Sequence, residues 1–430
     1  MKVLMFGWEF PPHISGGLGT ACYGLTKGLT GIPDVDVTFV VPKAFGDEDQ
    51  TAMRLIGANT VAISKKDFQF PETKNTIEYL EVDSEIIPYV GEEQFWKLKS
   101  EKYPGRVKFV ETDGNAKISF SGAYGPGLIQ EIKNYALVAR VIALENDFDV
   151  IHAHDWLAYP AGIAAKRATG KPLVVHVHAT DFDRSGGNVN QKVYSIEREG
   201  METADKIITV SNLTRNIVIE KYGIPAEKVV TVYNAVEPVN DESASLPPKG
   251  VNEKVVTFLG RITLQKGPEY FIEAASLVLK KMQNVRFVMA GSGDLMNAMV
   301  TRIADLGIAD KFHFTGFLKG NDVQSLFNMT DVFVMPSVSE PFGIVPLEAM
   351  QLQVPVIISN QSGVAEILKN AIKIDFWDTY AMADAIYGVL KYTSLADHFK
   401  KEGKHEVESL KWINSAHHVK QVYIDVLAGN

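Results

Sequence analysis

Short apolar runs rich in Val and Ile recur along this chain and alternate with stretches of helical periodicity. In the first half the apolar runs cover residues 3–6, 37–41, 150–153, 173–177, 207–210 and 229–232. Stretches with helical spacing lie between most of them, at 128–145, 157–168 and 213–222. This alternation is typical of a parallel sheet that is covered by helices on both faces.

The same rhythm resumes after a stretch of different composition. Residues 238–252 are rich in Pro, Ser, Gly and acidic residues, which is typical of a linker between domains. Beyond it, strands are expected at 255–259, 286–290, 312–314, 332–335 and 356–358, and helices around 270–281 and 295–306. A length of 430 residues exceeds one ordinary core. We therefore predict an α/β fold with two Rossmann-like doubly wound domains, 1–237 and 253–409.

Two segments leave alternatives open. Residues 410–430 show helical periodicity, and this helix either returns to the first domain or covers its own domain. Residues 89–124 interrupt the strand and helix rhythm with several aromatic residues. This segment is either an insertion that lines the acceptor side of a binding cleft or a surface excursion that is packed by its own aromatic rings.

Composition excludes several classes of function. The net charge of −9 and the absence of a run of Lys and Arg argue against nucleic-acid binding. No stretch is long and apolar enough to span a bilayer, and the opening residues form a strand carrying Glu9 rather than a signal peptide. The single Cys22, in an expected helix at 17–31, is interpreted as a packed core thiol. We predict a cytoplasmic protein.

Two carboxylates in the C-terminal third suit a nucleotide-sugar. Glu340 follows the apolar strand 332–335, and Glu348 lies eight residues later, just inside an expected helix. Between them, backbone N–H groups at the helix start, including those of Gly343 and Ile344, offer positive potential to a diphosphate. A pair of glycosidase carboxylates is the rival interpretation, because such a pair also flanks a sugar.

Basic and glycine-rich loops support the phosphate interpretation. Arg261 and Lys266 follow the strand that ends at Leu259, where ligands of α/β domains collect. Gly16 and Gly17 follow the first strand and allow a ligand to approach the backbone closely. Their spacing with Gly19 is not the dinucleotide fingerprint, which disfavours a nicotinamide oxidoreductase.

Histidines gather at two strand ends, as His152 with His154 and as His176 with His178. Alternate residues of a strand point to one face, so these pairs could ligate a metal. We favour the interpretation that they face substrate at the carboxyl ends of the strands, without a metal.

Together these segments resemble the retaining glycosyltransferases of the GT-B fold, the group that includes glycogen synthases and the mannosyl- and sucrose-type transferases. The resemblance covers nearly the whole chain. It rests on the Gly16-Gly17 loop, the His154-Asp155-Trp156 strand end, His178, Gly260-Arg261 with Lys266-Gly267, and the segment from Glu340 to Glu348.

The resemblance implies that the donor lies in an interdomain cleft with its nucleotide on the second domain. Its diphosphate would be bound by Arg261 and Lys266, with the backbone of Phe342, Gly343 and Ile344 at the leaving group. The resemblance further implies ribose contacts from Glu348, sugar contacts from Glu340 and His178, and sugar or acceptor contacts from Asp155. We add His154 and Glu9 to this acceptor set, and Gly16 and Gly17 would close over the phosphates. No metal or other cofactor is required when fixed cations stabilise the leaving group.

We therefore expect a glycogen-synthase-like α-glucosyltransferase that uses UDP- or ADP-glucose and an α-glucan acceptor. One departure from bacterial glycogen synthases is Ile14, which stands where that family typically has a lysine. The alternatives are a transferase of mannose, glucose or galactose that acts on a lipid-linked or surface-polysaccharide acceptor, and a non-catalytic carbohydrate-binding protein.

Overall fold

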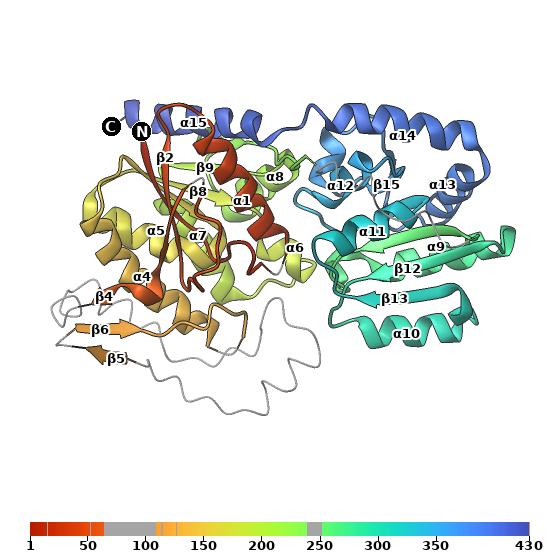
Figure 1. The fold of residues 1–430 in the computed structure, drawn as a ribbon, viewed down its shortest axis with the longest axis horizontal. Helices are drawn as coiled ribbons and strands as arrows, with labels where there is room; N and C mark the ends of the chain where they lie inside the picture. The colour runs from red at the N-terminus through yellow and green to blue at the C-terminus, as the bar shows by residue number, and fades with distance from the viewer. Residues whose placement is uncertain are drawn as a thin grey trace. The chain divides into compact units, whose positions relative to one another are not determined.

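The chain forms two compact units. The computed structural model describes residues 1–63 except 15 and 52, 109–112, 115–125, 127–238 and 252–429 (Figure 1). Unit 1 comprises Met1–Asp181, Val189–Asn234 and Trp412–Asn430, and unit 2 comprises Phe182–Asn188 and Ala235–Lys411. Most of the expected linker and residues 89–108 of the aromatic segment lie outside the described residues.

Unit 1 is built on a seven-stranded sheet in which every neighbouring pair is parallel. The strand order is β10-β9-β8-β7-β1-β2-β3. In chain order the strands are β1 (Lys2–Phe6), β2 (Asp36–Val41), β3 (Arg54–Gly57), β7 (Val150–His154), β8 (Leu173–Val177), β9 (Lys206–Thr209) and β10 (Val229–Thr231). The sequence order reverses between β1 and β7, so this pair is the topological switch point.

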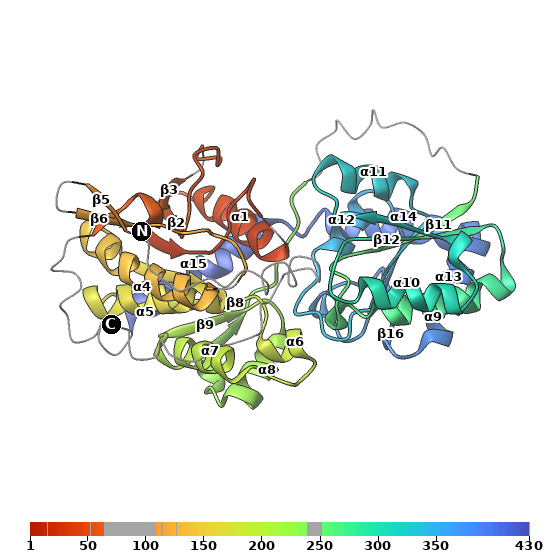
Figure 2. The ribbon, with the colours of Figure 1, turned by 90° about the horizontal axis from the view of Figure 1, so that it is seen from below.

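Helices cover both faces of this sheet. Right-handed crossovers on opposite sides of a switch point place their helices on opposite faces. Accordingly α1 (Gly17–Thr30), between β1 and β2, contacts α15 (Trp412–Ala428), whereas α5 (Asp155–Thr169), between β7 and β8, contacts α4 (Leu128–Glu145). Figure 2 shows α4 beside α5. The remaining helices of unit 1 are α7 (Gln191–Thr203) and α8 (Asn212–Tyr222). In the short α6 (Asp181–Ser185) only Asp181 belongs to unit 1, and the other residues belong to unit 2.

Glycines allow α1 and α15 to approach closely. A Cβ added to Gly24 would lie 2.3 Å from the Trp412 ring, and one added to Gly28 would lie 2.7 Å from the Trp412 carbonyl oxygen. Trp412 and Tyr423 of α15 are both buried. The last described helix is therefore part of the core of unit 1.

A small antiparallel sheet is also present in the first half of the chain, with the order β4-β6-β5. Its strands are β4 (Ala62–Ile63), β5 (Phe109–Thr112) and β6 (Asn115–Ile118). The latter two belong to the aromatic segment 89–124, so part of that segment is regular structure. This hairpin was not expected, because its strands are short and polar.

Unit 2 contains a six-stranded sheet, again with every neighbouring pair parallel. Its order, β13-β12-β11-β14-β15-β16, is that of a Rossmann fold, with the switch point between β11 and β14. The strands are β11 (Lys254–Leu259), β12 (Val285–Ala290), β13 (Phe312–Gly316), β14 (Val332–Met335), β15 (Val356–Ser359) and β16 (Ile372–Ile374). The helices are α9 (Pro268–Lys281), α10 (Met296–Asp305), α11 (Asn321–Met329), α12 (Val345–Gln351), α13 (Thr379–Lys391) and α14 (Thr393–Val407).

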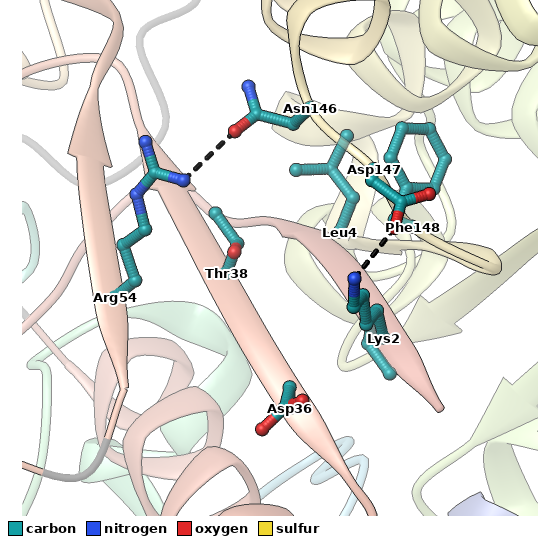
Figure 3. Close-up of a pocket in the computed structure, with 9 residues that line it drawn as sticks. Lys2, Leu4, Asp36, Thr38, Arg54, Asn146, Asp147 and Phe148 are labelled. Atoms are coloured by element: carbon teal, nitrogen blue, oxygen red, sulfur yellow. Dashed lines mark hydrogen bonds and ion pairs between the residues drawn. The ribbon is translucent and has the colours of Figure 1, made fainter.

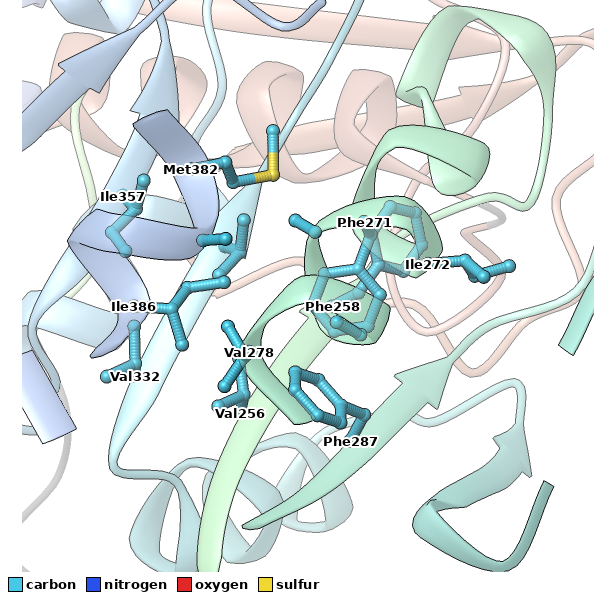
Figure 4. Packing of buried hydrophobic residues seen from close by; sticks show 14 of the residues in the cluster. Val256, Phe258, Phe271, Ile272, Val278, Phe287, Val332, Ile357, Met382 and Ile386 are labelled. Atoms are coloured by element: carbon cyan, nitrogen blue, oxygen red, sulfur yellow. The ribbon is translucent and has the colours of Figure 1, made fainter. Parts of the chain in front are cut away.

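One large apolar core supports this second sheet. Side chains of β11, β12 and β14 meet those of α9 and α13, including Phe258, Phe271, Phe287 and Ile386 (Figure 4). All four are at most 2% exposed. This packing fixes the strands whose carboxyl ends carry the polar residues described next. The predicted α/β class with two Rossmann-like sheets is confirmed.

Candidate functional site

The predicted site residues gather at the two switch points. In unit 2, Arg261 and Lys266 follow β11, and Glu340 follows β14. In unit 1, Glu9 and the glycine loop follow β1, and Asp155 follows β7. Neighbouring loops diverge where the strand order reverses and leave a crevice at the carboxyl ends of the strands, which is where α/β sheets bind ligands. The fold therefore places both groups at a favoured position.

An ion pair joins the two loops at the switch point of unit 2. The Lys266 ammonium donates to Oε2 of Glu340, and the Ser337 hydroxyl donates to the same oxygen at 3.2 Å. Glu340 is only 7% exposed, whereas the Lys266 side chain is 21% exposed. Arg261 lies on the same loop as Lys266 and donates to Oε1 of Gln265 at 3.2 Å. Two cations and one carboxylate thus occupy one side of the sheet edge.

Backbone hydrogen bonds hold the Glu340 loop in place. The Glu340 N–H donates to the carbonyl of Gln361 at 2.9 Å, and the Gly363 N–H donates to the carbonyl of Glu340 at 2.8 Å. The Val338 N–H donates to the carbonyl of Gln265, which connects this loop to the loop after β11. The Glu340 carboxylate is therefore fixed from several sides, as a preorganised group must be.

Glycine is required where these loops approach one another. Gly267 has a φ of +62°, and a Cβ at this position would lie 2.2 Å from the carbonyl oxygen of Pro336. Gly343 has a φ of +98°, which turns the chain from the Glu340 loop into α12. Both positions exclude ordinary side chains.

The remaining predicted donor residues surround the start of α12. Ile344 is the N-cap residue of this helix, next to Gly343, and the buried Phe342 directly precedes Gly343. Glu348 lies in the first turn of α12, where its surroundings raise the pKa of its carboxyl group to about 7 by desolvation. At neutral pH this carboxyl group therefore exists in both protonation states, which is unusual for a glutamate.

At the switch point of unit 1, Glu9 is buried and accepts a hydrogen bond from the Tyr124 hydroxyl. Gly16 is the N-cap residue of α1 and Gly17 its first residue, and a Cβ at either would meet no atom within 4 Å. Gly19 differs, because a Cβ there would lie 2.4 Å from the Ile14 side chain and 3.2 Å from a Glu9 oxygen. Gly16 and Gly17 thus leave open space at the helix start, whereas Gly19 is required by packing.

Asp155 begins α5 in a strained conformation. Its φ is +61°, in the left-handed region that non-glycine residues seldom occupy, and it is 2% exposed. Strain of this kind persists where the surrounding structure imposes it, and it is common at functional positions. His154, immediately before it, ends β7 and is fully buried.

His178, just beyond β8, contacts His154. Nε2 of His178 lies 2.9 Å from Nδ1 of His154, so one ring donates to the other. Desolvation lowers the pKa of His178 to about 3. It is therefore neutral over the whole physiological range and cannot donate from a charged imidazolium to a substrate.

His152 and His176, which the sequence analysis grouped with His154 and His178 as pairs facing substrate, join the same cluster. His154 and His176 are in register on β7 and β8, so the alternation of side chains places all four histidines on one face of the sheet. The His176 ring stacks on those of His152 and His178, with interplanar angles of 7° and 16°. Burial lowers the pKa of His152, His154 and His176 well below 6.5, so these rings are neutral.

Other supporting residues had no recognisable signal in the sequence. Ser337 and Gln265 orient Glu340 and Arg261, and Tyr124 orients Glu9. Ser and Gln are common in loops, and Tyr124 is 115 residues away from its partner along the chain. Only folding reveals these pairs.

A hollow in unit 1 lies at the wrong edge of the sheet for this chemistry. It has a volume of about 310 Å³ and is lined by Lys2, Asp36, Arg54 and Asp147 among others (Figure 3). These residues lie at or just before the beginnings of strands, opposite the carboxyl ends. Lys2 pairs with Asp147, and Arg54 donates a hydrogen bond to Asn146, so two of the lining cations already have partners within the hollow. Among the described residues, none of the helices has the length and apolarity of a bilayer span.

Comparison with protein families gives two adjoining matches. Residues 241–406 match the model of glycosyl transferases group 1, and residues 100–239 match that of glycosyltransferase family 4. The chain is 28% identical over 444 aligned residues to an uncharacterized glycosyltransferase of Methanocaldococcus jannaschii, covering 98% of each chain. It is 23% identical to the glycogen synthase of Mycobacterium tuberculosis, covering 100% of this chain and 96% of that one.

Solved structures share the fold. The Anabaena protein HepE, crystallised with UDP and glucose, superposes with a TM-score of 0.66 at 18% identity, covering 98% of this chain and 99% of that one. At this identity the likeness shows a shared fold with two Rossmann-like domains.

Proposed function

Because this chain belongs to the group 1 glycosyltransferases of the GT-B fold, we propose that it is a retaining enzyme that transfers glucose from UDP- or ADP-glucose to an α-1,4-glucan. The observation that carries the proposal is the Lys266–Glu340 ion pair at the switch point of unit 2, with Arg261 on the same loop. The full-length similarity to a glycogen synthase supports the glucan, and the UDP and glucose in HepE support a uridine donor.

In the proposed reaction the bond between glucose C1 and the diphosphate oxygen breaks, and its electrons leave with the diphosphate. Arg261 and Lys266 stabilise the negative charge that grows there, and the backbone N–H groups of Gly343 and Ile344 add to this stabilisation. Because these groups are already held in place by the loop contacts, little reorganisation accompanies the charge movement. Such fixed cations would perform the task that a metal ion performs in other transferases.

Glu340 and Glu348 recognise hydroxyl groups in this proposal. Glu340 accepts hydrogen bonds from the transferred glucose, and its pairing with Lys266 places the sugar next to the diphosphate. Glu348 accepts from the ribose hydroxyls, for which its ionised form is the competent one. The two-carboxylate hydrolase mechanism is disfavoured, because Glu340 is paired with a cation that suits a phosphate.

Retention of configuration requires the acceptor hydroxyl to attack C1 from the face that the diphosphate leaves. A new bond forms between C1 and the acceptor oxygen, and the acceptor proton passes to the departing diphosphate oxygen. We propose that His178, as a neutral imidazole, contacts the sugar. We assign Asp155, His154 and Glu9 to the sugar and acceptor, and Gly16 and Gly17 to the phosphates.

The experiment that tests this function measures release of nucleoside diphosphate from ADP-, UDP- and GDP-linked glucose and mannose, with and without glycogen or malto-oligosaccharide. We expect release from one glucose donor that rises with glucan and is accompanied by chain extension in mass spectra. An α-linked product, identified by NMR, would support retention.

Two other outcomes would redirect the proposal. If nucleoside diphosphate is released at the same rate with and without glucan, the protein is still a transferase but glucan is not its acceptor. This result would favour a lipid-linked or surface-polysaccharide acceptor. No release from any donor would contradict the transferase and favour a carbohydrate-binding protein.

A further inference from the structure

Several buried ring nitrogens in the histidine cluster of unit 1 have no hydrogen-bond partner among the described residues. His152, His154 and His176 are at most 2% exposed. Among the described residues, no group forms a hydrogen bond with Nε2 of His152, with Nε2 of His154 or with either nitrogen of His176. Leaving a buried polar atom unsatisfied costs about 1–3 kcal/mol, so several such atoms within one cluster require an explanation.

The geometry points to a divalent cation. One ring nitrogen of each of His152, His154 and His176 lies within 4.8 Å of one nitrogen of each of the other two. In a tetrahedral zinc site the Zn–N distance is about 2.0–2.1 Å, so ligand nitrogens are roughly 3.4 Å apart. Because the limit of 4.8 Å is wider than this spacing, binding an ion requires the three rings to turn toward one point. We propose that this triad binds one borderline divalent ion of the zinc type, with the unpartnered nitrogens as ligands.

Zinc-type ions suit this donor set. Imidazole is a preferred ligand of Zn²⁺, Co²⁺ and Ni²⁺, whereas Mg²⁺ and Ca²⁺ require oxygen ligands. The ligands come from two adjacent strands whose register is fixed, so they are presented on a rigid surface. The negative charges of Asp155 and Glu9 both act on Cys22, which itself has an atom within 4.8 Å of a nitrogen of His154. These acids offset part of the charge of a buried cation.

Hydrogen bonds around the triad fit the role of a second shell. A ligand that binds metal through Nε2 carries its proton on Nδ1. His152 would then donate from Nδ1 to the Tyr423 hydroxyl, 2.6 Å away on α15. His154 would donate from Nδ1 to Nε2 of His178 at 2.9 Å. The ion would thus set the tautomers of both ligands and orient His178. Because both nitrogens of His154 would then be occupied, His154 would act on the sugar only through His178 and not by the direct contact proposed above.

Two other groups of potential ligands serve as controls. Cys22, His154 and His178 form an overlapping triad, but burial raises the pKa of the Cys22 thiol, which disfavours the thiolate that a metal requires. His13, Asp47 and Glu48 form a third group in which His13 and Asp47 are exposed. His13 already contacts Asp47 at 2.7 Å, and Glu48 accepts from the N–H groups of Phe45 and Gly46.

The test uses the full chain without an affinity tag, treated with a chelator and then titrated with Zn²⁺ by calorimetry and with Co²⁺ by visible absorption. We expect one ion per chain and the intense d–d bands of a tetrahedral Co²⁺ site without a thiolate charge-transfer band. His176→Asn should weaken binding by roughly 100-fold or more, since the loss of a mere second-shell contact already costs 10–100-fold. His13→Ala should leave binding unchanged.

Each other result would overturn the assignment. Absence of Zn²⁺ and Co²⁺ binding by the wild-type chain would exclude the site. Binding that survives His176→Asn but is lost in His13→Ala would assign the ion to the exposed group. A charge-transfer band that disappears in Cys22→Ser would assign it to the overlapping triad. Circular dichroism identifies a variant that does not fold, and the wild-type Co²⁺ spectrum decides the case without any variant.

Discussion

Both sheets are parallel and reverse their strand order once, but the residues at their carboxyl edges differ in charge. In unit 1 the edge carries stacked, neutral histidines and a strained Asp155. In unit 2 it carries Arg261 and the Lys266–Glu340 pair, in which Lys266 remains partly accessible to water although Glu340 is buried. Burial explains the contrast between the histidines and the ion pair, because it keeps the histidine rings neutral, while mutual pairing preserves the charges of Lys266 and Glu340. Fixed cations that can bind a diphosphate therefore lie at the second edge.

If this contrast is correct, removing a cation from unit 2 has the largest effect. We expect Lys266→Met and Arg261→Ala each to lower kcat/KM by about 10²-fold or more, because each cation stabilises the leaving diphosphate in the transition state. Arg261→Ala should also weaken nucleotide binding, measured by calorimetry. The matched control is Lys281→Met, which removes an exposed pair with Asp384 and should change little. Unchanged activity in both site variants would break the comparison.

Glu340→Gln is expected to have the next largest effect. The amide keeps the shape but loses the charge, so hydrogen bonds to the sugar hydroxyls weaken and Lys266 loses its partner. We expect kcat/KM to fall by roughly 10-fold to 100-fold, with nucleoside diphosphate affinity largely kept, since the nucleotide does not contact Glu340 in the proposed arrangement. Steady-state kinetics and calorimetry measure the two quantities. A loss of nucleotide affinity equal to the loss of activity would contradict the assignment.

Glu348 makes donor affinity depend on pH within unit 2. Its pKa of about 7 lies above the ordinary value of 4.5, so its carboxyl group is protonated below pH 7 and ionised above it. Because the ionised form accepts from ribose, affinity for the nucleotide-sugar should rise by several-fold up to about 10-fold between pH 6 and pH 8. Calorimetry with the intact donor measures this, since its diphosphate diester does not titrate there. Glu348→Gln should flatten the profile; a variant that keeps the wild-type slope would exclude Glu348.

The smallest expected effect concerns the pH profile of His178 in unit 1. With its pKa near 3, this ring stays neutral from pH 5.5 to pH 8. His178→Asn should therefore lower kcat/KM by the same factor across this range, so that the ratio of wild type to variant changes less than about twofold. Any acid limb of the wild-type profile near pH 6.5 should survive the substitution. Its disappearance would show that His178 titrates and would break the contrast between the two edges.

Many of the helices and strands could be predicted from the sequence, because parallel strands that are buried on both faces consist of continuous apolar residues. The helix at 128–145 and the strands at 173–177 and 332–335 were predicted with the bounds that the structure shows. β3 and β16 were missed, since β3 has only two large apolar residues between Arg54 and Gly57, and Lys373 interrupts the apolar pattern of β16. Helix α7 was missed as well, because its surface is mostly polar.

The site was predictable only as far as its residues follow strands. Arg261, Lys266, Glu340 and His178 became candidates because each lies in a loop that follows an apolar run. The direct bond between Lys266 and Glu340 could not be predicted, since 74 residues separate them and their meeting depends on the reversal of strand order between β11 and β14. The hydrogen bond between His152 and Tyr423 could not be predicted either, because Tyr423 lies on α15, 271 residues further along the chain.

The position of α15 also governs the order of events during synthesis. A ribosome translates all of unit 2 before Trp412 and Tyr423, so the glycine face of α1 and the ring of His152 must wait for their partners. Unit 1, although translated first, therefore reaches its final form last. The surface of α1 that packs against α15 therefore stays exposed on the nascent chain longest, and it is the surface that a chaperone could bind for the longest time.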